Sequence, residues 1–101
     1  MKIIKRSGSE DIFDAAKIVA AIRKANDSVL DYEKLTADQI EEIASNVETA
    51  CENMKRSPSV EEIQDMVENQ LMDIKAHDVA RHYITYRYVQ SLKRQTNTTD
   101  E

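Results

Sequence analysis

Two short segments with apolar residues open the chain and predict a β-hairpin. Residues 2–6 (KIIKR) and 10–13 (EDIF) lie on either side of Ser7-Gly8-Ser9. Because Gly8 can adopt the positive φ that a tight hairpin turn requires, we expect these two segments to pair with each other.

From Asp14 onwards the apolar residues recur at the spacing of a helix. Asp14 is placed as the N-cap of this first helix, which ends at Asn26-Asp27-Ser28. A polar connection over residues 27–35 follows. Thr36 and Gln39 then form a capping box, which predicts the start of a second helix that runs to about Met54. The two apolar stripes contain Ala15, Ile18, Val19, Ile22 and Ala25, and then Ile40, Ile43, Ala44, Val47, Cys51 and Met54.

Pro58 marks the clearest break in the chain because it disfavours helical geometry at Ser57. Residues 59–62 (SVEE) form another capping box and predict a third helix, and after a short connection at residues 75–77 a fourth helix follows. The apolar stripes are Ile63, Met66, Val67, Leu71 and Ile74 in the third helix, and Val79, Ala80, Tyr83, Ile84, Tyr88 and Leu92 in the fourth.

These elements predict an α+β domain that is mostly α, with a hairpin followed by four helices. A chain of 101 residues can bury one core, which excludes an enzyme as large as a barrel or a doubly wound sheet. We expect one domain over residues 1–95 and a polar, disordered C-terminal tail over residues 96–101.

The composition excludes several classes of site. One cysteine cannot form a disulfide framework or a multi-thiolate zinc site, and it favours a reducing compartment, so we expect a cytoplasmic protein. No apolar run approaches the length of a membrane span, and the first ten residues do not resemble a secretion signal. With a single glycine, no Gly-rich phosphate loop can form. A bound phosphate would need Lys and Arg side chains.

The formal charge of −5 is unevenly distributed along the chain. Residues 1–24 carry six bases and three acids, residues 25–80 carry four bases and fourteen acids, and residues 81–94 carry four bases and no acid. The acidic middle argues against a broad nucleic-acid interface. A local anion site between the hairpin and the last helix remains open, and so does the alternative that these bases are solvated or pair with the acidic helices.

Arg87 lies on the apolar stripe of the fourth helix, at i+4 from Tyr83. A desolvated guanidinium needs a carboxylate, a phosphate or a path to water, so a structural ion pair and a snorkelling side chain are both open. Tyr83, Tyr86 and Tyr88 can pack in the core or flank a base. No arrangement of residues typical of catalysis or of a metal site is recognisable.

Four blocks of sequence together resemble an ATP-cone over about residues 2–94. They are residues 3–8 (IIKRSG), residues 13–25 with their FDAAKI and AIRKA segments, residues 59–65 (SVEEIQD) and residues 79–87 (VARHYITYR). Within this family the chain is most similar to the N-terminal cone of anaerobic ribonucleoside-triphosphate reductases. The other common host, a reductase-gene repressor, carries a four-Cys zinc ribbon that this chain lacks.

The resemblance implies a β-hairpin capping a four-helix bundle that binds ATP or dATP, either alone or together with Mg2+. It implies a regulatory domain without a catalytic site, which controls the overall activity of a ribonucleotide reductase. The implied partners are the nucleoside triphosphate and the catalytic domain of the reductase, and a homo-oligomer is allowed. No membrane or nucleic-acid partner is expected.

The resemblance also implies which residues contact the nucleotide. Lys5, Arg6, Lys17 and Arg87 would neutralise the phosphates, which carry about four negative charges, with directional contacts from the guanidiniums. The other implied contacts are Ile3, Asp11, Asp14, Ile18, Ser59 and Gln64. Ser7, Asp11 and Ser59 depart from the residues usual in the family. The alternative is a degenerate cone that acts as a helical protein interaction module and binds no nucleotide.

Overall fold

The computed structural model describes the backbone of residues 1–99 and the side chains of residues 1–93. It confirms the hairpin. Strands β1 (Lys2–Ile4) and β2 (Glu10–Ile12) pair antiparallel, with Ile3 opposite Asp11. In the turn the Gly8 amide donates to the Lys5 carbonyl at 2.9 Å, and Gly8 has a φ of 89°. This is the positive φ for which glycine is suited.

Four helices follow the hairpin, as the apolar pattern predicts. They are α1 (Ala15–Asn26), α2 (Ala37–Glu52), α3 (Val60–Asp73) and α4 (His77–Thr99). The Asp14 cap and both predicted capping boxes are present. The connection between α1 and α2 contains a short 3-10 helix, η1 (Asp31–Glu33), that was not predicted. Helix α2 ends two residues before Met54, whose amide donates to the Cys51 carbonyl in a tighter turn.

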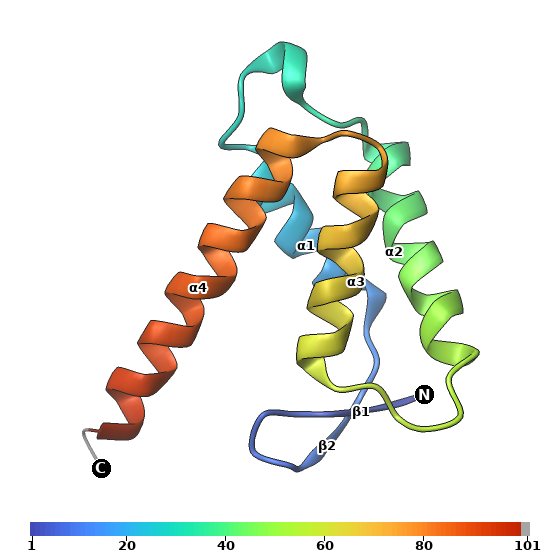
Figure 1. Cartoon of the computed structure of the whole chain (residues 1–101), viewed down its shortest axis with the longest axis vertical. Coiled ribbons are helices and arrows are strands. Elements are labelled where there is room, and N and C mark those ends of the chain that lie inside the picture. Colours follow the sequence, from blue (N-terminus) through green and yellow to red (C-terminus); the bar gives the residue numbers. More distant parts are fainter. Residues whose placement is uncertain (100–101) are drawn as a thin grey trace.

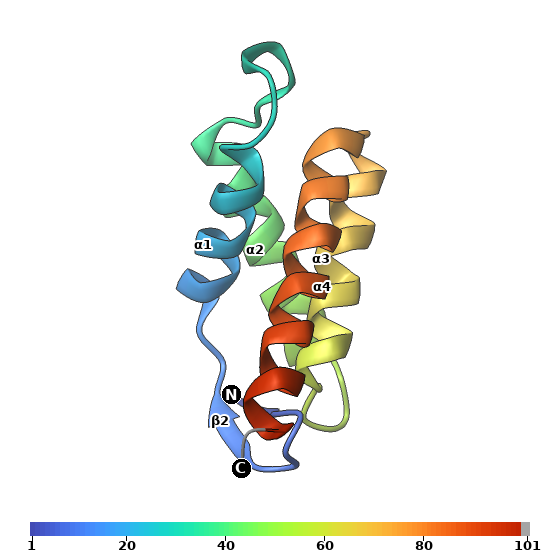
Figure 2. The same cartoon turned by 90° about the vertical axis from the view of Figure 1, so that its left-hand side faces the viewer.

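The four helices surround one apolar core. Helix α1 packs against α2 and α4, and α3 packs against the same two helices (Figures 1 and 2). The most buried large side chains come from all four helices; they include Ile22, Val47, Val67, Leu71 and Val79. Among the described residues, no helix combines the length and the apolar character that crossing a membrane requires.

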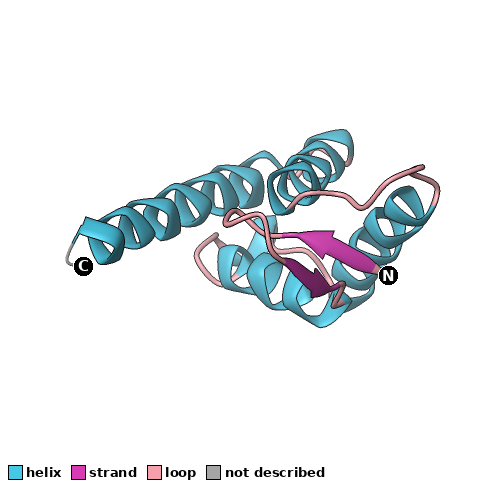
Figure 3. Ribbon diagram, turned by 90° about the horizontal axis from the view of Figure 1, so that it is seen from below, coloured by secondary structure: helices cyan, strands magenta, loops and turns pink. Residues whose placement is uncertain are grey.

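The hairpin covers one end of this bundle (Figures 1 and 3). The Ile4 amide donates to the Pro58 carbonyl at 2.9 Å, and Ile4 also forms a parallel β-bridge with Ser59. Pro58 is itself buried. The break that the proline imposes before α3 therefore also fixes the hairpin next to the first turn of that helix.

Helix α4 differs from its prediction in two ways. Its apolar stripe is buried only at Val79, Ala80 and Tyr83, whereas Ile84 and Tyr88 are 45% and 64% exposed. Figure 1 shows why: the second half of α4 diverges from its neighbours. The backbone of residues 96–99 is helical where a disordered tail was expected. The rest of that tail, residues 100–101, lies outside the described residues, and the domain boundary at residue 95 stays a prediction.

Candidate functional site

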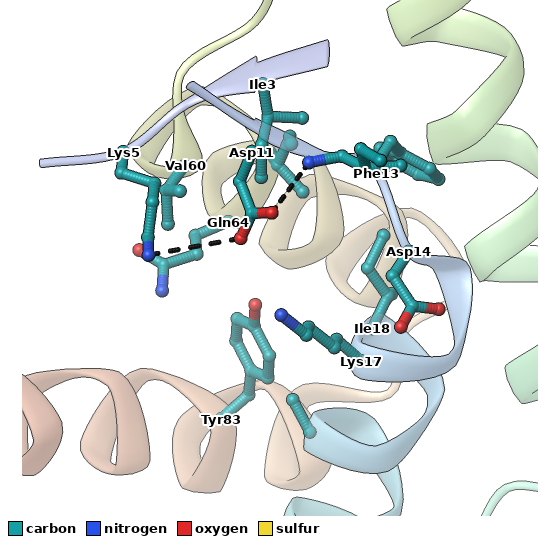
Figure 4. Close-up of a pocket in the computed structure, with 13 residues that line it drawn as sticks. Ile3, Lys5, Asp11, Phe13, Asp14, Lys17, Ile18, Val60, Gln64 and Tyr83 are labelled. Carbon is teal, nitrogen blue, oxygen red and sulfur yellow. Dashed lines mark hydrogen bonds and ion pairs between the residues drawn. The ribbon is translucent and has the colours of Figure 1, made fainter. Parts of the chain in front are cut away.

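A cavity of about 220 Å3 lies where the hairpin, α1, α3 and α4 meet (Figure 4). Most of its wall is apolar. The apolar side chains are Ile3, Ile12, Phe13, Ile18, Ala21, Val60 and Ile63. Such a wall favours a flat or apolar part of a ligand, and a few polar groups within it would set the orientation.

Two ammonium groups line the cavity. The Lys5 Nζ lies 3.9 Å from Asp11 Oδ2, while Asp11 Oδ1 accepts from the Ile12 amide at 2.8 Å. Lys17, on the first turn of α1, is exposed and makes no ion pair with any described residue. Its side chain points into the cavity in Figure 4. The Lys17 charge is therefore available to an anion that enters.

Asp14 also lines the cavity but already has a structural partner. Its Oδ1 accepts from the Ala16 amide at 3.0 Å, which caps α1. The carboxylate thus satisfies one of the free amides at the start of the helix and complements its positive end.

Gln64 and Tyr83 supply the remaining polar groups. The Gln64 Oε1 atom is buried and has no hydrogen-bond partner among the described residues. Tyr83 is only 5% exposed, and its hydroxyl points into the cavity (Figure 4). Burial raises the pKa of Tyr83 to about 12, although the nearby Arg87 charge opposes this shift. The phenol therefore stays protonated at neutral pH.

A second cavity, of about 400 Å3, contains the two predicted arginines, Arg6 and Arg87. The Arg6 Nη1 lies 2.9 Å from Glu61 Oε1. The Arg87 Nη1 donates to Asp65 Oδ1 at 2.8 Å and to Glu68 Oε1 at 2.7 Å. Burial alone would lower the pKa of Arg87, but these two hydrogen bonds outweigh it and raise the pKa above its ordinary value.

The predicted site residues therefore fall into three groups. One set lines the first cavity: Ile3, Lys5, Asp11, Asp14, Lys17, Ile18 and Gln64. Arg6 and Arg87 line the second cavity instead. Ser59 lines neither of these cavities, and its hydroxyl accepts from the Glu62 amide to cap α3.

The structure does not bring the four predicted cations to one point. The acidic face of α3 explains the difference, because Glu61, Asp65 and Glu68 hold both guanidiniums there. Of the alternatives left open for Arg87 by its sequence, the structure shows the ion pair, with Asp65 and Glu68 as the partners. The hairpin and α4 are nevertheless neighbours, since both cavities take residues from each of them.

Sequence reasoning did not select Tyr83, Phe13 or Val60 as site residues, although all three line the first cavity. Tyr83 belongs to the apolar stripe of α4 and to the tyrosine cluster, both of which are typical of core packing. The tyrosine cluster was a signal for it, but the pattern alone does not tell which tyrosine reaches a cavity.

The cavity has no ligand set of its own for a metal ion. Among the described residues, no group of three His, Cys, Asp or Glu side chains is placed to hold one. Magnesium that accompanies a nucleotide takes most of its ligands from phosphate and water. We therefore assign no residue of this chain to it.

Comparison with known proteins identifies the family of this chain. Residues 1–92 match the family described as "ATP cone domain". The chain belongs to the ATP cone family. This match confirms the resemblance inferred from the four sequence blocks, and it covers the hairpin and nearly all of the helical bundle.

Proteins similar to this ATP cone include ribonucleotide reductases. It is 40% identical to a vitamin B12-dependent ribonucleoside-diphosphate reductase of Thermoplasma acidophilum, over 85% of this chain and 11% of that protein. It is 33% identical to an anaerobic ribonucleoside-triphosphate reductase of Haemophilus influenzae, over 92% of this chain and 13% of that protein. It is 31% identical to a ribonucleoside-diphosphate reductase subunit alpha of Chlamydia trachomatis, over 99% of this chain and 10% of that protein. The chain thus spans about a tenth of the length of these curated relatives.

Proposed function

We propose that this ATP cone binds ATP or dATP in the first cavity and acts as a regulatory domain of a ribonucleotide reductase. The observation that carries the proposal is the combination within that cavity of an apolar wall and two ammonium groups. The wall suits a base, and Lys5 and Lys17 suit the phosphates. Catalysis would belong to the rest of the reductase, because none of the proposed roles in this chain is catalytic.

The regulation would be allosteric. A bound nucleotide can shift the arrangement of a larger protein only through different affinities for its states. The cavity suits this role because its wall comes from the hairpin and three helices, so a ligand that draws β1 and α4 together changes the surface that both present. The relatives include three kinds of reductase and do not select the anaerobic kind.

Thermal unfolding with and without nucleotide tests the proposal. At a free ATP concentration of about 100 times Kd, binding adds roughly 2.7 kcal/mol to the free energy of unfolding. For a domain of this size we expect Tm to rise by more than about 5 °C. Inorganic triphosphate at the same concentration is the control for a general anion effect. If neither millimolar ATP nor millimolar dATP raises Tm, that result would contradict nucleotide binding.

A second candidate function is favoured by the exposed face of α4. Ile84 and Tyr88 lie one turn apart and are 45% and 64% exposed, which suits contact with another protein surface. A chain that shows no Tm shift with nucleotide but associates through this face would be an interaction module. Replacing both residues with Ser would then weaken association and leave Tm with ATP unchanged.

A further inference from the structure

Three charged side chains, here called the Arg87 cluster, join helix α4 to helix α3. Arg87 of α4 donates through Nη1 to Asp65 Oδ1 at 2.8 Å and to Glu68 Oε1 at 2.7 Å. The side chains of Arg87 and Glu68 are only 22% and 23% exposed. Charged groups that are removed from water to this extent depend on each other, because the loss of one leaves the other without its partner.

The Arg87 cluster lies beside the wall of the first cavity. Tyr83, which lines the cavity, precedes Arg87 by one turn of α4 and therefore lies on the same side of that helix. On α3, Ile63 lines the cavity two residues before Asp65. The pKa of Tyr83 is raised to about 12 mainly by burial, and the three charges of the cluster also act on this pKa. The cluster therefore ties together the two helices that carry these parts of the wall.

Around Arg87, two apolar side chains of α4 are exposed rather than packed. Ile84 and Tyr88 are 45% and 64% exposed. Arg87 lies at about the middle of α4, and the second half of this helix diverges from its neighbours (Figure 1). The ion pairs of Arg87 therefore hold the middle of α4 against α3.

We propose that the Arg87 cluster positions the wall of the first cavity, by holding the turn of α4 that carries Tyr83 against α3. Asp65 and Glu68 already neutralise the Arg87 charge. In this role Arg87 acts on a bound nucleotide through Tyr83 and makes no contact with a phosphate. The inference rests on the proposed function and adds to it the residues that keep the cavity in its binding form.

The expected effect on affinity follows from a shift between two forms of the chain. Without the cluster, α4 spends part of its time away from α3. A nucleotide that binds only the form with the complete cavity loses apparent affinity in proportion to the fraction of that form. The affinity for ATP should therefore fall whether the guanidinium or its carboxylate partner is removed.

Titration calorimetry of ATP with the 101-residue chain and two single variants tests the direction of these effects. Arg87→Met and Glu68→Met each replace a charged side chain of the cluster with an unbranched apolar one. We expect each variant to bind ATP about 3- to 10-fold more weakly than the wild-type chain. If Arg87 instead contacted a phosphate, Glu68→Met would free the guanidinium and remove a negative charge, so the affinity for ATP would rise.

The double variant that combines Arg87→Met with Glu68→Met tests whether the two residues act as one unit. Because the same interaction is lost in the single and the double variants, the double variant should lose no more than about twofold beyond the weaker-binding single variant. Losses of affinity that multiply would show two independent roles and would contradict the inference.

Arg56→Met is the matched control for Arg87→Met. Arg56 also forms an ion pair with a carboxylate of α3, that of Glu62, but it lines neither cavity. The control removes the same charge without disturbing the contact between α3 and α4. We expect its affinity for ATP to stay within about twofold of the wild-type affinity.

Amide NMR spectra of the free variants show whether the effect reaches the cavity wall before any ligand binds. Glu68→Met should shift the signal of Tyr83 although the two residues belong to different helices, and it should leave the signals of η1 at the far end of the bundle unchanged. A general loss of stability would not produce this pattern in a folded chain, and the Tm of each free variant shows that it is folded.

The inference is overturned if Glu68→Met binds ATP as tightly as the wild-type chain or more tightly, if its Tyr83 signal does not move, or if Arg56→Met loses as much affinity as Arg87→Met. Weaker binding by both variants of the cluster, with the control unchanged, supports it. If the wild-type chain binds no ATP at all, the proposed function fails, and this inference fails with it.

Discussion

At the scale of single residues, the proposed binding of phosphate depends most on Lys17. This exposed lysine makes no ion pair with a described residue, so little of the folding free energy depends on it. For Lys17→Ala we expect an ATP affinity about 10-fold lower, because one phosphate contact is lost. The free energy of unfolding without nucleotide should change by less than about 0.5 kcal/mol. Titration calorimetry and urea unfolding measure the two quantities.

Lys55→Ala is the matched control for Lys17→Ala. Lys55 is also exposed, but it lines none of the cavities described above. Lys55→Ala should change neither the affinity for ATP nor the free energy of unfolding. Equal losses of ATP affinity in the two variants would mean that the nucleotide responds only to the overall charge of the chain.

Arg6 gives a contrasting prediction because it is already paired with Glu61. This partly exposed ion pair contributes roughly 0–1 kcal/mol, so Arg6→Ala should still fold. If a nucleotide phosphate reaches Arg6, it must displace Glu61. Glu61→Gln should then raise the affinity for ATP while Arg6→Ala lowers it, which calorimetry measures. Unchanged affinity in both variants would show that Arg6 stays with α3.

Glu62 links stability to pH. Hydrogen bonds from Arg56 and from the Ser59 amide lower the pKa of Glu62 from 4.5 to about 2. A carboxyl group whose pKa is lowered in the folded state stabilises that state above its unfolded pKa and loses this effect as the pH falls. Tm should therefore fall between about pH 5 and pH 2. Glu62→Gln, which can keep the capping box, should reduce this fall, and an unchanged pH profile would contradict it.

At the scale of secondary-structure elements, the end of α3 shows a residue in an unfavourable conformation. The Ala76 amide donates to the Leu71 carbonyl and the Lys75 amide to the Met72 carbonyl, which is the Schellman pattern. This pattern places Lys75 at a φ of 63°, in the left-handed region that favours glycine.

Replacing that lysine should stabilise the domain. For Lys75→Gly we expect the free energy of unfolding to rise by up to about 1 kcal/mol, because glycine adopts a left-handed conformation with less strain. Lys55→Ala again serves as a reference for the loss of a surface lysine. Chemical denaturation measures the difference, and a less stable Lys75→Gly chain would show that the lysine side chain contributes more than the strain costs.

Elements could be predicted from the sequence wherever short-range chemistry specifies them. Thr36 with Gln39 and Ser59 with Glu62 lie within one turn of each other, so their capping boxes are visible in the chain itself. The outward course of α4 depends on which helices pack beside it, and Ile84 and Tyr88 carry no local sign of it. The role of Asn26 also has no local sign in the sequence. Its buried side-chain amide donates to the Leu35 carbonyl and accepts from the Leu35 amide.

At the scale of the whole molecule, the candidate site depends on how distant segments meet. The contribution of Ile3, Lys17 and Gln64 to one cavity follows from the family resemblance, because no pattern within a single element connects them. The pairing of Arg6 and Arg87 with α3 could not be predicted. The sequence offers these guanidiniums many carboxylates, and only the packing of α3 against α4 and the hairpin decides between them.

The hairpin is the element through which a ligand in the cavity would affect the rest of the molecule. It is joined to α3 by the hydrogen bond of Ile4 with Pro58 and leads directly into α1. A ligand that contacts the hairpin therefore acts on both helices. We expect such contacts to make the hairpin more rigid, which would strengthen the protection of its amides against hydrogen exchange.

The most direct test of ATP binding in the first cavity is a two-dimensional amide NMR titration of the chain with ATP. If ATP binds in the first cavity, saturable shifts will be concentrated in β1, β2, the first turn of α1, residues 60–64 of α3 and residue 83 of α4. Saturable shifts confined to residues that do not line the first cavity, or no saturable shifts at millimolar ATP, would contradict it.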